Sequence, residues 1–439
     1  MNLYDLRDSI DNNDVGKEMY GLIEELYPIC RSITGNGARQ SLDILKKHIP
    51  LTIQEIPTGT QVFDWTVPKE WNIKDACIKN SKGDKVIDFQ DSNLHVVNYS
   101  VPIRKEMTLA ELKDHLHTIP EYPDWIPYRT SYYKETWGFC LSHNQFLKLE
   151  DDDYEVLIDS SLKDGHLAYG EYYLSGRNGD EILISCHICH PSLSNDNLSG
   201  IAVSTFLAKY LSSLSLKFSY RFLFIPGTIG SITWLSLNES NVSKIKHGLV
   251  LACVGDSGRY TYKKSRLGNA EIDRIVMNIL KHSGEENKAI DFSPYGYDER
   301  QYCSPGFNLP VGCFMRTPYG EYPEYHTSAD NLDFVQPGYL AASFSMLLSI
   351  LSVIESNDRY LSLNSKCEPQ LGRRGLYDHL GGKAGSKARQ LAMLWVLNLS
   401  DGSQTLLDIS DRSGLDFSLI KNAADSLTDS GLITVMDKR

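Results

Sequence analysis

The segment SCHICHPSLSNDNLSG, residues 185–200, concentrates side chains that can bind a metal. It follows an apolar run and precedes a helical pattern, so it is expected at the carboxyl end of a strand, where open α/β sheets bind ligands. The segment offers the imidazoles of His187 and His190, the thiol of Cys189 and the carboxylate of Asp196, and His and carboxylate ligands at a strand end suit zinc. The alternative is a polar turn whose histidines are only hydrogen-bonded.

Two further segments carry acids or imidazoles at informative places. The apolar run GLVLACVGDSG ends at Asp256, which is either a metal ligand or the cap of a helix. The segment RTPYGEYPEYHTSADN, residues 316–331, places His326 among aromatic and acidic side chains. The alternative for this third segment is a solvated loop.

Strand-like and helix-like runs alternate from about residue 155 onward, and this alternation must position the three segments. Strands are expected at residues 155–162, 181–188, 219–226, 246–256 and 309–316. Helices are expected at residues 197–214, 269–284 and 338–356. Such alternation predicts a mostly parallel sheet between two layers of helices, a three-layer α/β/α core.

The rest of the chain divides by composition. Residues 1–60 and 151–365 are expected to form the core, and residues 61–150, rich in Trp, Tyr and Pro, a small β-rich inserted domain. The alternative for 61–150 is an elaborate loop of the main domain. Residues 366–439 combine three short helices, a turn at Gly414 and a strand, which predicts a winged helix.

Composition limits the partners and the compartment. The 439 residues hold 44 Lys and Arg against 56 Asp and Glu, and an acidic surface disfavours nucleic acid and anionic lipid. The expected recognition helix of the winged helix carries a single basic residue, Lys421, so we expect a protein partner or self-association there and not DNA. Nine scattered cysteines, no signal-like N-terminus and no ~20-residue apolar run favour a cytoplasmic protein without a membrane segment.

Together the three segments carry a resemblance. DN-x-SG after a strand-end His, a later strand-end Asp and then HTSAD resemble the co-catalytic zinc aminopeptidases, the family of bacterial leucyl aminopeptidase and glutamate carboxypeptidase. The whole chain resembles a bacterial aminopeptidase-like family, some of whose members are connected with polysaccharide biosynthesis. That family adds a β-rich insert and a C-terminal winged helix to the zinc-peptidase core, and segments such as SYYKETWGFCLS and DERQYCSPGFNLPVG are typical of it.

The resemblance implies a set of zinc ligands. His187 matches the first ligand, Asp196 the carboxylate that bridges two metals, Asp256 the remaining ligand of the first zinc, and His326 the histidine of the second. A site of this type activates a bridging water and polarises the scissile carbonyl.

Two departures from the family pattern affect the expected chemistry. Cys189 stands where an Asp would orient the first histidine. Gly227 and Thr228 stand where the family has its general base and a ligand of the second zinc, so we expect one tight zinc and a weaker second. Glu299, Glu321 or Glu324 could replace the missing base.

Several residues are candidates for binding the substrate. Arg300 could bind a substrate carboxylate bidentately or pair with Asp298, and Glu324 is a second candidate substrate-binding residue. Aromatic residues of the insert could line the cleft or pack in a core; they are Tyr132, Tyr133 and Trp137. The sequence predicts a zinc-dependent aminopeptidase-like hydrolase of a peptide or an amide-linked small molecule, with an incomplete standard site. The alternatives are a metal-binding pseudoenzyme or ligand-binding protein, and a winged-helix regulator with a sensor domain.

Overall fold

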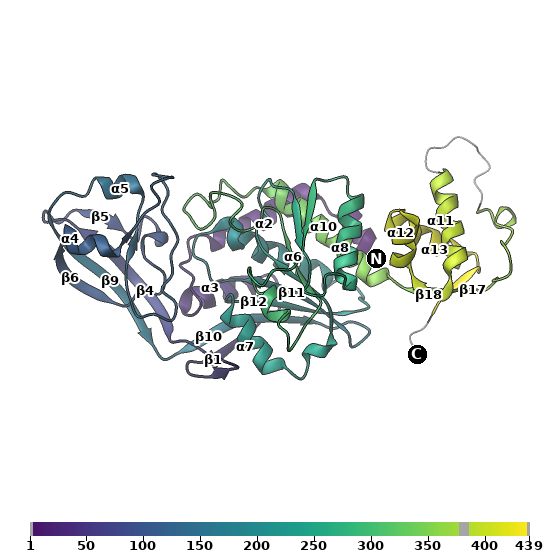
Figure 1. Ribbon diagram of the computed structural model, residues 1–439, viewed down its shortest axis with the longest axis horizontal. Helices are drawn as coiled ribbons and strands as arrows, with labels where there is room; N and C mark the ends of the chain where they lie inside the picture. The colour runs from purple at the N-terminus through teal and green to yellow at the C-terminus, as the bar shows by residue number, and fades with distance from the viewer. Residues whose placement is uncertain (1–2, 377–385, 437–439) are drawn as a thin grey trace.

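Three parts follow one another along the long axis of the molecule. The computed structural model describes residues 3–376 and 386–436. Figure 1 shows a β-rich part at one end, an α/β core in the middle and a small helical part at the other end.

An eight-stranded mixed sheet forms the centre of the core, in the order β1-β10-β12-β11-β13-β16-β14-β15. The four strands β12, β11, β13 and β16 are parallel, whereas β10 and β14 join them antiparallel. The strand bounds are β1 Thr52–Pro57, β10 His166–Leu174, β11 Glu181–His187, β12 Ser219–Ile225, β13 Ile245–Leu251, β14 Tyr260–Lys263, β15 Asn287–Ile290 and β16 Val311–Met315. The carboxyl ends of the four parallel strands share one edge of the sheet, where a site is expected.

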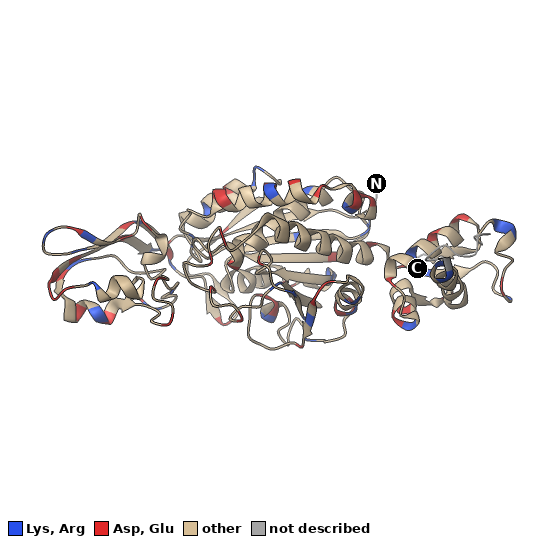
Figure 2. Cartoon of the chain, turned by 90° about the horizontal axis from the view of Figure 1, so that it is seen from above, with Lys and Arg blue, Asp and Glu red and all other residues tan. Residues whose placement is uncertain are grey.

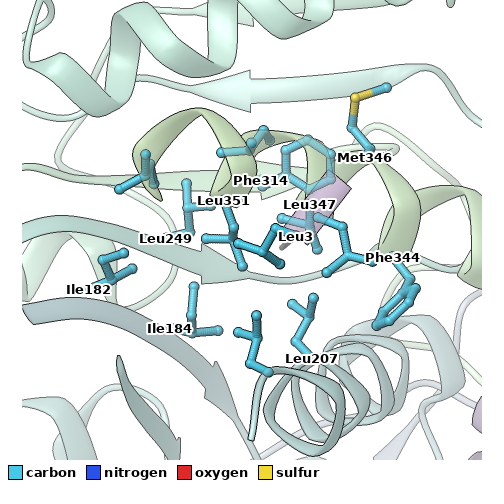
Figure 3. Packing of buried hydrophobic residues seen from close by; sticks show 14 of the residues in the cluster. Leu3, Ile182, Ile184, Leu207, Leu249, Phe314, Phe344, Met346, Leu347 and Leu351 are labelled. Carbon is cyan, nitrogen blue, oxygen red and sulfur yellow. The ribbon is translucent and has the colours of Figure 1, made fainter. Parts of the chain in front are cut away.

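Helices cover both faces of this sheet, which confirms the predicted α/β/α core. Alternate residues of β11 face opposite layers: Ile182 and Ile184 pack with α6 and α10, whereas Leu183 packs on the side of α7. Figure 3 shows the first layer, with apolar side chains of the strands and helices in contact. The helix bounds are α1 Leu3–Ser9, α2 Asn12–Leu26, α3 Asn36–Leu45, α6 Gly200–Leu211, α7 Ile229–Asn238, α8 Glu271–His282, α9 Glu299–Tyr302 and α10 Pro337–Ser356.

The longest helix of the core, α10, is also its most apolar. It is the one helix of the described residues that is long and apolar enough to cross a membrane, and 67% of its most apolar window is buried. It packs against α2, and the two backbones come so close that a Cβ on Gly16 would collide with the carbonyl oxygen of Pro337. The first long helix of the chain therefore rests on the last helix of the core.

The insert is an antiparallel four-stranded sheet in the order β5-β4-β9-β6. It extends beyond the boundary expected at residue 150, because β9, Asp153–Lys163, pairs with β4, Glu70–Lys79, and not with the core. The expectation that residues 155–162 are a core strand was wrong. The remaining elements are β2 Gln61–Val62, β3 Trp65–Thr66, β5 Lys85–Asp88, β6 Ile103–Thr108, α4 Leu109–Leu112, β7 Leu116–His117, β8 Phe139–Cys140 and α5 His143–Leu147.

The C-terminal part has the predicted winged-helix elements. Three helices, α11 Ser386–Leu399, α12 Leu406–Ser413 and α13 Phe417–Asp429, pack beside the strands β17 Arg359–Ser362, β18 Asp401–Thr405 and β19 Ile433–Val435. β17 is the central strand of that sheet, so the part begins before the expected boundary at residue 366. Arg274 of α8 donates hydrogen bonds to Asp408 and Asp411 of α12, which ties this part to the core.

Candidate metal centre

A fully buried carboxylate, that of Asp196, lies among three imidazoles at the carboxyl edge of the parallel strands. Nε2 of His187 is 2.9 Å from Oδ1 of Asp196, and Nε2 of His326 is 3.0 Å from Oδ2. Nδ1 of His190 is 3.3 Å from the same Oδ2. The structure therefore brings together three of the four predicted ligands and adds His190.

Aromatic rings orient two of these imidazoles. The ring of His187, the last residue of β11, stacks on Tyr297 with centroids 4.8 Å apart, and Tyr325 stacks on His326 at 4.0 Å. The side-chain nitrogen of Asn197 lies 3.4 Å from Nδ1 of His187. Stacking and a neutral amide thus hold the rings where the family pattern uses a carboxylate at the position of Cys189.

The insert helps to position the third segment. The backbone N–H of Tyr128 donates to the carbonyl of His326 at 2.8 Å, and that of Ile126 donates to the Ser328 hydroxyl at 2.9 Å. The Tyr128 ring also meets the rings of His190 and His326 edge-on, at 5.2 and 5.1 Å. The site is therefore shared between the core and residues 126–128 of the insert.

Burial and mutual charge set the protonation of the cluster. Burial lowers the pKa of His187 and of His326, so both rings are neutral at neutral pH. Burial opposes ionisation of Asp196, but the neighbouring His190 and His187 hold its pKa well below its usual range. Burial likewise opposes protonation of His190, yet the Asp196 carboxylate raises its pKa well above its usual value. Neutral imidazoles and an ionised carboxylate are the forms that bind zinc.

The residues present fit a metal ion. His187, His190 and Asp196 each offer one ligand atom, and these atoms lie within 4.8 Å of one another. Two imidazoles and a carboxylate are a zinc donor set that leaves a fourth position open. His190 was expected as one of two imidazoles at this strand end but not as a ligand; the signal for it is the paired imidazoles of HICH at the end of a strand.

Asp256 does not join this cluster. Its Oδ1 accepts hydrogen bonds from the Thr317 hydroxyl and the Gly258 N–H, both at 2.6 Å, and its Oδ2 accepts one from the Asn195 amide at 2.9 Å. These donors occupy both carboxylate oxygens. In the structure Asp256 therefore anchors a loop, and its role as a zinc ligand stays a prediction.

A cavity of about 190 Å³ opens beside the imidazoles. Its lining comes from the ends of β11 and β12 and from the loops around residues 297 and 325; it includes His187, Cys189, His190, Gly227, Thr228, Tyr295, Tyr297, Asp298, Arg300, Tyr319, Tyr325 and His326. Arg300 is one of these lining residues, and its contact with a substrate carboxylate stays a prediction. The cavity is smaller than the ~300–1,000 Å³ usual for drug-sized ligands, so it suits one compact group.

The acidic candidates for the missing base do not line this cavity. Glu299 forms an ion pair of 2.8 Å with Lys263, and both side chains are fully buried. Glu321 is exposed and lies 3.6 Å from Lys288. Glu324 is half-buried and is not among the residues that line the cavity, so its roles in substrate binding or as a base stay predictions.

The aromatic residues of the insert that were candidates for lining the cleft do not line the cavity. Trp137 stacks on His115 at 3.7 Å within the insert, and Tyr133 is 52% exposed. The Tyr132 hydroxyl lies 3.1 Å from that of Tyr128, so Tyr132 supports the ring that touches the imidazoles. Tyr128, which sequence reasoning missed, is the aromatic residue of the insert that reaches the cluster.

Comparisons with known proteins agree with this architecture. Residues 20–357 match a family described as a domain of unknown function, DUF4910, and residues 358–435 match a winged helix-turn-helix family. A Clostridium acetobutylicum protein, provisionally named a polysaccharide biosynthesis protein with an aminopeptidase-like domain, is 59% identical over 417 residues, 95% of this chain and 96% of its own. The crystal structure of a provisionally named peptidase from that organism has a TM-score of 0.93 at 57% identity and 97% coverage of each chain.

More distant structures share the fold of the core. A zinc aminopeptidase of Bacillus subtilis has a TM-score of 0.56 at 12% identity, covering 76% of this chain and 94% of its own. An M28 peptidase precursor of Shewanella amazonensis has a TM-score of 0.56 at 13% identity, covering 78% and 96%. The chain thus belongs to the DUF4910 family, and it joins an aminopeptidase-like α/β core to a C-terminal winged helix.

Proposed function

We propose that this protein is a zinc-dependent, aminopeptidase-like hydrolase that cleaves an amide bond in a peptide or a small molecule. The observation that carries the proposal is the buried Asp196 carboxylate with its imidazoles beside a small cavity at the carboxyl edge of the parallel strands. His187, His190 and Asp196 would hold one zinc. The zinc aminopeptidase fold of the core supports this choice of metal.

The bound zinc would supply a polarised amide carbonyl and a water of lowered pKa. The chain itself supplies the orientation: Tyr297 and Tyr325 fix the rings of His187 and His326 by stacking. His326 contacts the second oxygen of Asp196 and would keep that carboxylate in place, or share it with a weaker second metal. Thr228 lines the cavity where the family pattern has a further ligand, and a hydroxyl binds zinc poorly.

The proposed substrate is compact and carries a negative or polar group beside the amide. Arg300 contributes a guanidinium to the cavity wall, and its Nε has no hydrogen-bond partner among the described residues. A carboxylate on the substrate would satisfy that donor. The name of the Clostridium relative connects it with polysaccharide biosynthesis, and an amide-linked group on a sugar precursor would suit the same cavity.

The experiment is metal analysis together with a turnover assay. The native protein should retain about one equivalent of zinc after dialysis and hydrolyse at least one member of a panel of aminoacyl and acyl-sugar amides. His190→Ala should lose zinc, whereas His166→Ala, which removes an exposed imidazole on β10, should keep it. Zinc retention without any turnover would favour the pseudoenzyme alternative, and absence of zinc would refute the site.

For the winged helix we propose a role in protein contacts and not in reading DNA. Lys421 of α13 is already paired with Asp425 one turn along the helix, at 2.5 Å. Figure 2 shows acidic and basic residues interspersed over the described helices of this part. Without a basic face the phosphate-driven part of DNA affinity is missing. Salt-dependent binding of a DNA duplex would contradict this assignment.

The state of the cysteines suits a reducing compartment. All nine cysteines lie in the described part of the chain and are free, and seven of them are buried. Free buried thiols are the usual state in a reducing cytoplasm. We therefore place the activity in the cytoplasm, which localisation of a tagged protein would test.

A further inference from the structure

We propose that Asp298 is the proton-transfer residue of the cleft and acts in place of the general base that is absent at Gly227. The inference rests on the proposed hydrolase function and adds a catalytic residue to it. Asp298 comes directly before α9 and was not among the residues singled out as a base. The assignment rests on the position of Asp298 near Gly227, on its free Oδ2, on the hydrogen bond that holds its Oδ1, and on the neighbouring carboxylates, which are already paired.

The carboxylate of Asp298 lies close to Gly227, the residue at which the family pattern has its general base. It lines the cavity together with His187, His190 and Gly227. A Cβ placed on Gly227 would lie 3.2 Å from the Cβ of His187 and 3.7 Å from Oδ2 of Asp298. The carboxylate of Asp298 thus reaches, from another element, the neighbourhood that a side chain at residue 227 would enter.

One oxygen of Asp298 is held and the other is free. Oδ1 accepts a hydrogen bond of 2.7 Å from the hydroxyl of Ser231 on α7. Oδ2 is buried and has no hydrogen-bond partner among the described residues. Burying a polar atom without a hydrogen-bond partner is destabilising, so a partner for Oδ2 in the cavity is favoured. A water or a substrate group beside the imidazoles would provide it.

The neighbouring carboxylates have other tasks. Glu299 is paired with Lys263, and Asp330 accepts hydrogen bonds from the backbone N–H groups of Asn195 and Asp196, at 2.6 and 3.0 Å. Asp196 is surrounded by imidazoles. Among the described residues that line the cavity, Asp298 is the acidic one, and it keeps an oxygen available for a proton.

The proton balance of the step is simple. The oxygen of a water attacks the amide carbon while one of its protons passes to Oδ2 of Asp298. The C–N bond then breaks, and the proton on Oδ2 passes to the leaving nitrogen, so one water is added and Asp298 is regenerated. Burial raises the pKa of Asp298 to about 7, against a smaller lowering by the Ser231 hydrogen bond, and a value near the working pH suits both transfers.

The test compares zinc-loaded variants of the full chain. Asp298→Asn should lower kcat by about 10²–10⁴-fold, the usual contribution of a general acid or base, while KM and zinc content stay within about twofold. Asp333→Asn, the same change on an exposed residue outside the cavity, should leave kcat unchanged. Adding Gly227→Glu to Asp298→Asn should restore part of the loss, since Gly227 does not have a positive φ and its Cβ would need only a small shift of His187, whose Cβ would lie 3.2 Å away.

A second measurement does not depend on turnover. A crystal structure of the zinc-loaded native protein should show an ordered water within ~3 Å of Oδ2 of Asp298. Turnover that survives Asp298→Asn, or an Oδ2 with no water beside it, overturns the assignment of Asp298 but leaves the proposed function intact. A zinc-loaded native protein that hydrolyses no amide overturns both.

Discussion

Asp196 and Asp256 are two buried carboxylates at the same edge of the sheet, and they have opposite kinds of partners. Asp196 faces His187, His190 and His326, whose imidazoles can bind a metal in their neutral form. Asp256 faces a hydroxyl, a backbone N–H and an amide, which only donate. The comparison leads us to expect that the partners of a strand-end carboxylate, more than its position, decide whether it binds a metal.

The largest expected effect is that of Asp196→Ala. This variant should lose zinc binding completely, because it removes the carboxylate shared by all three imidazoles. Its circular-dichroism spectrum should stay native, since the sheet does not depend on that side chain. Zinc retained at one equivalent in the variant would show that the metal lies elsewhere, and a collapsed spectrum would make Asp196 structural.

The next effect separates His190 from His326. His190→Ala should weaken zinc binding by more than about 100-fold, whereas His326→Ala should weaken it by about tenfold if His326 only supports the shared carboxylate. Isothermal titration of zinc into both variants provides the comparison. Equal losses would mean that the two imidazoles hold metal alike.

Acid should weaken zinc binding in a direction that the pKa of His190 fixes. That pKa is raised, so the ring is protonated at neutral pH and below, and zinc must displace this proton. Affinity should fall about tenfold for each pH unit below the His190 pKa. The metal-free protein responds in the opposite sense: stability linked to a raised pKa is present at low pH and lost as the pH rises through the folded value.

The control for that pH dependence is His190→Ala. In this variant the roughly tenfold loss of zinc affinity per pH unit that comes from the His190 proton should disappear. Titrations between pH 6 and pH 8, in the same buffer and at the same ionic strength, measure it. A slope that persists in the variant would assign the proton to another group of the cluster.

The smallest effect on the metal is expected at the other carboxylate. Asp256→Asn should leave zinc affinity within about twofold, because its oxygens are occupied by donors. It should lower the free energy of unfolding by about 1–3 kcal/mol, since one oxygen that accepts hydrogen bonds becomes a donor. Urea unfolding measures the free energy of unfolding. A loss of zinc binding in this variant would show that Asp256 serves the metal as Asp196 does.

The sequence predicted the core and much of the cluster because strong local signals mark them. Unbroken apolar runs gave the parallel strands, and a polar segment after β11 located His187 and Asp196. The same signals could not show where a strand stops. The apolar run toward Asp256 continues past Leu251, where β13 ends, so the chain has already turned away before the carboxylate is reached.

The other differences between the expected and the observed structure depend on contacts between residues that are far apart in the chain. Residues 155–162 read as a strand from sequence, and they are one, but whether β9 joins the core or the insert depends on β4, far away in the chain. Asp298 and Glu299 are adjacent, and successive residues of a helical turn point in different directions. Only the positions of Lys263 and Ser231 show which acid faces the cavity.

The contact between α2 and α10 has a consequence for biosynthesis. Gly16 meets the backbone of Pro337, and the apolar side chains of Met19, Leu22 and Ile23 are buried in the same core. Roughly 320 residues separate the two contact points, which a ribosome adding ~5–20 residues/s takes roughly 15–65 s to synthesise. During that time the apolar face of α2 has no native partner on α10. The nascent chain should therefore be a chaperone client until its core is complete.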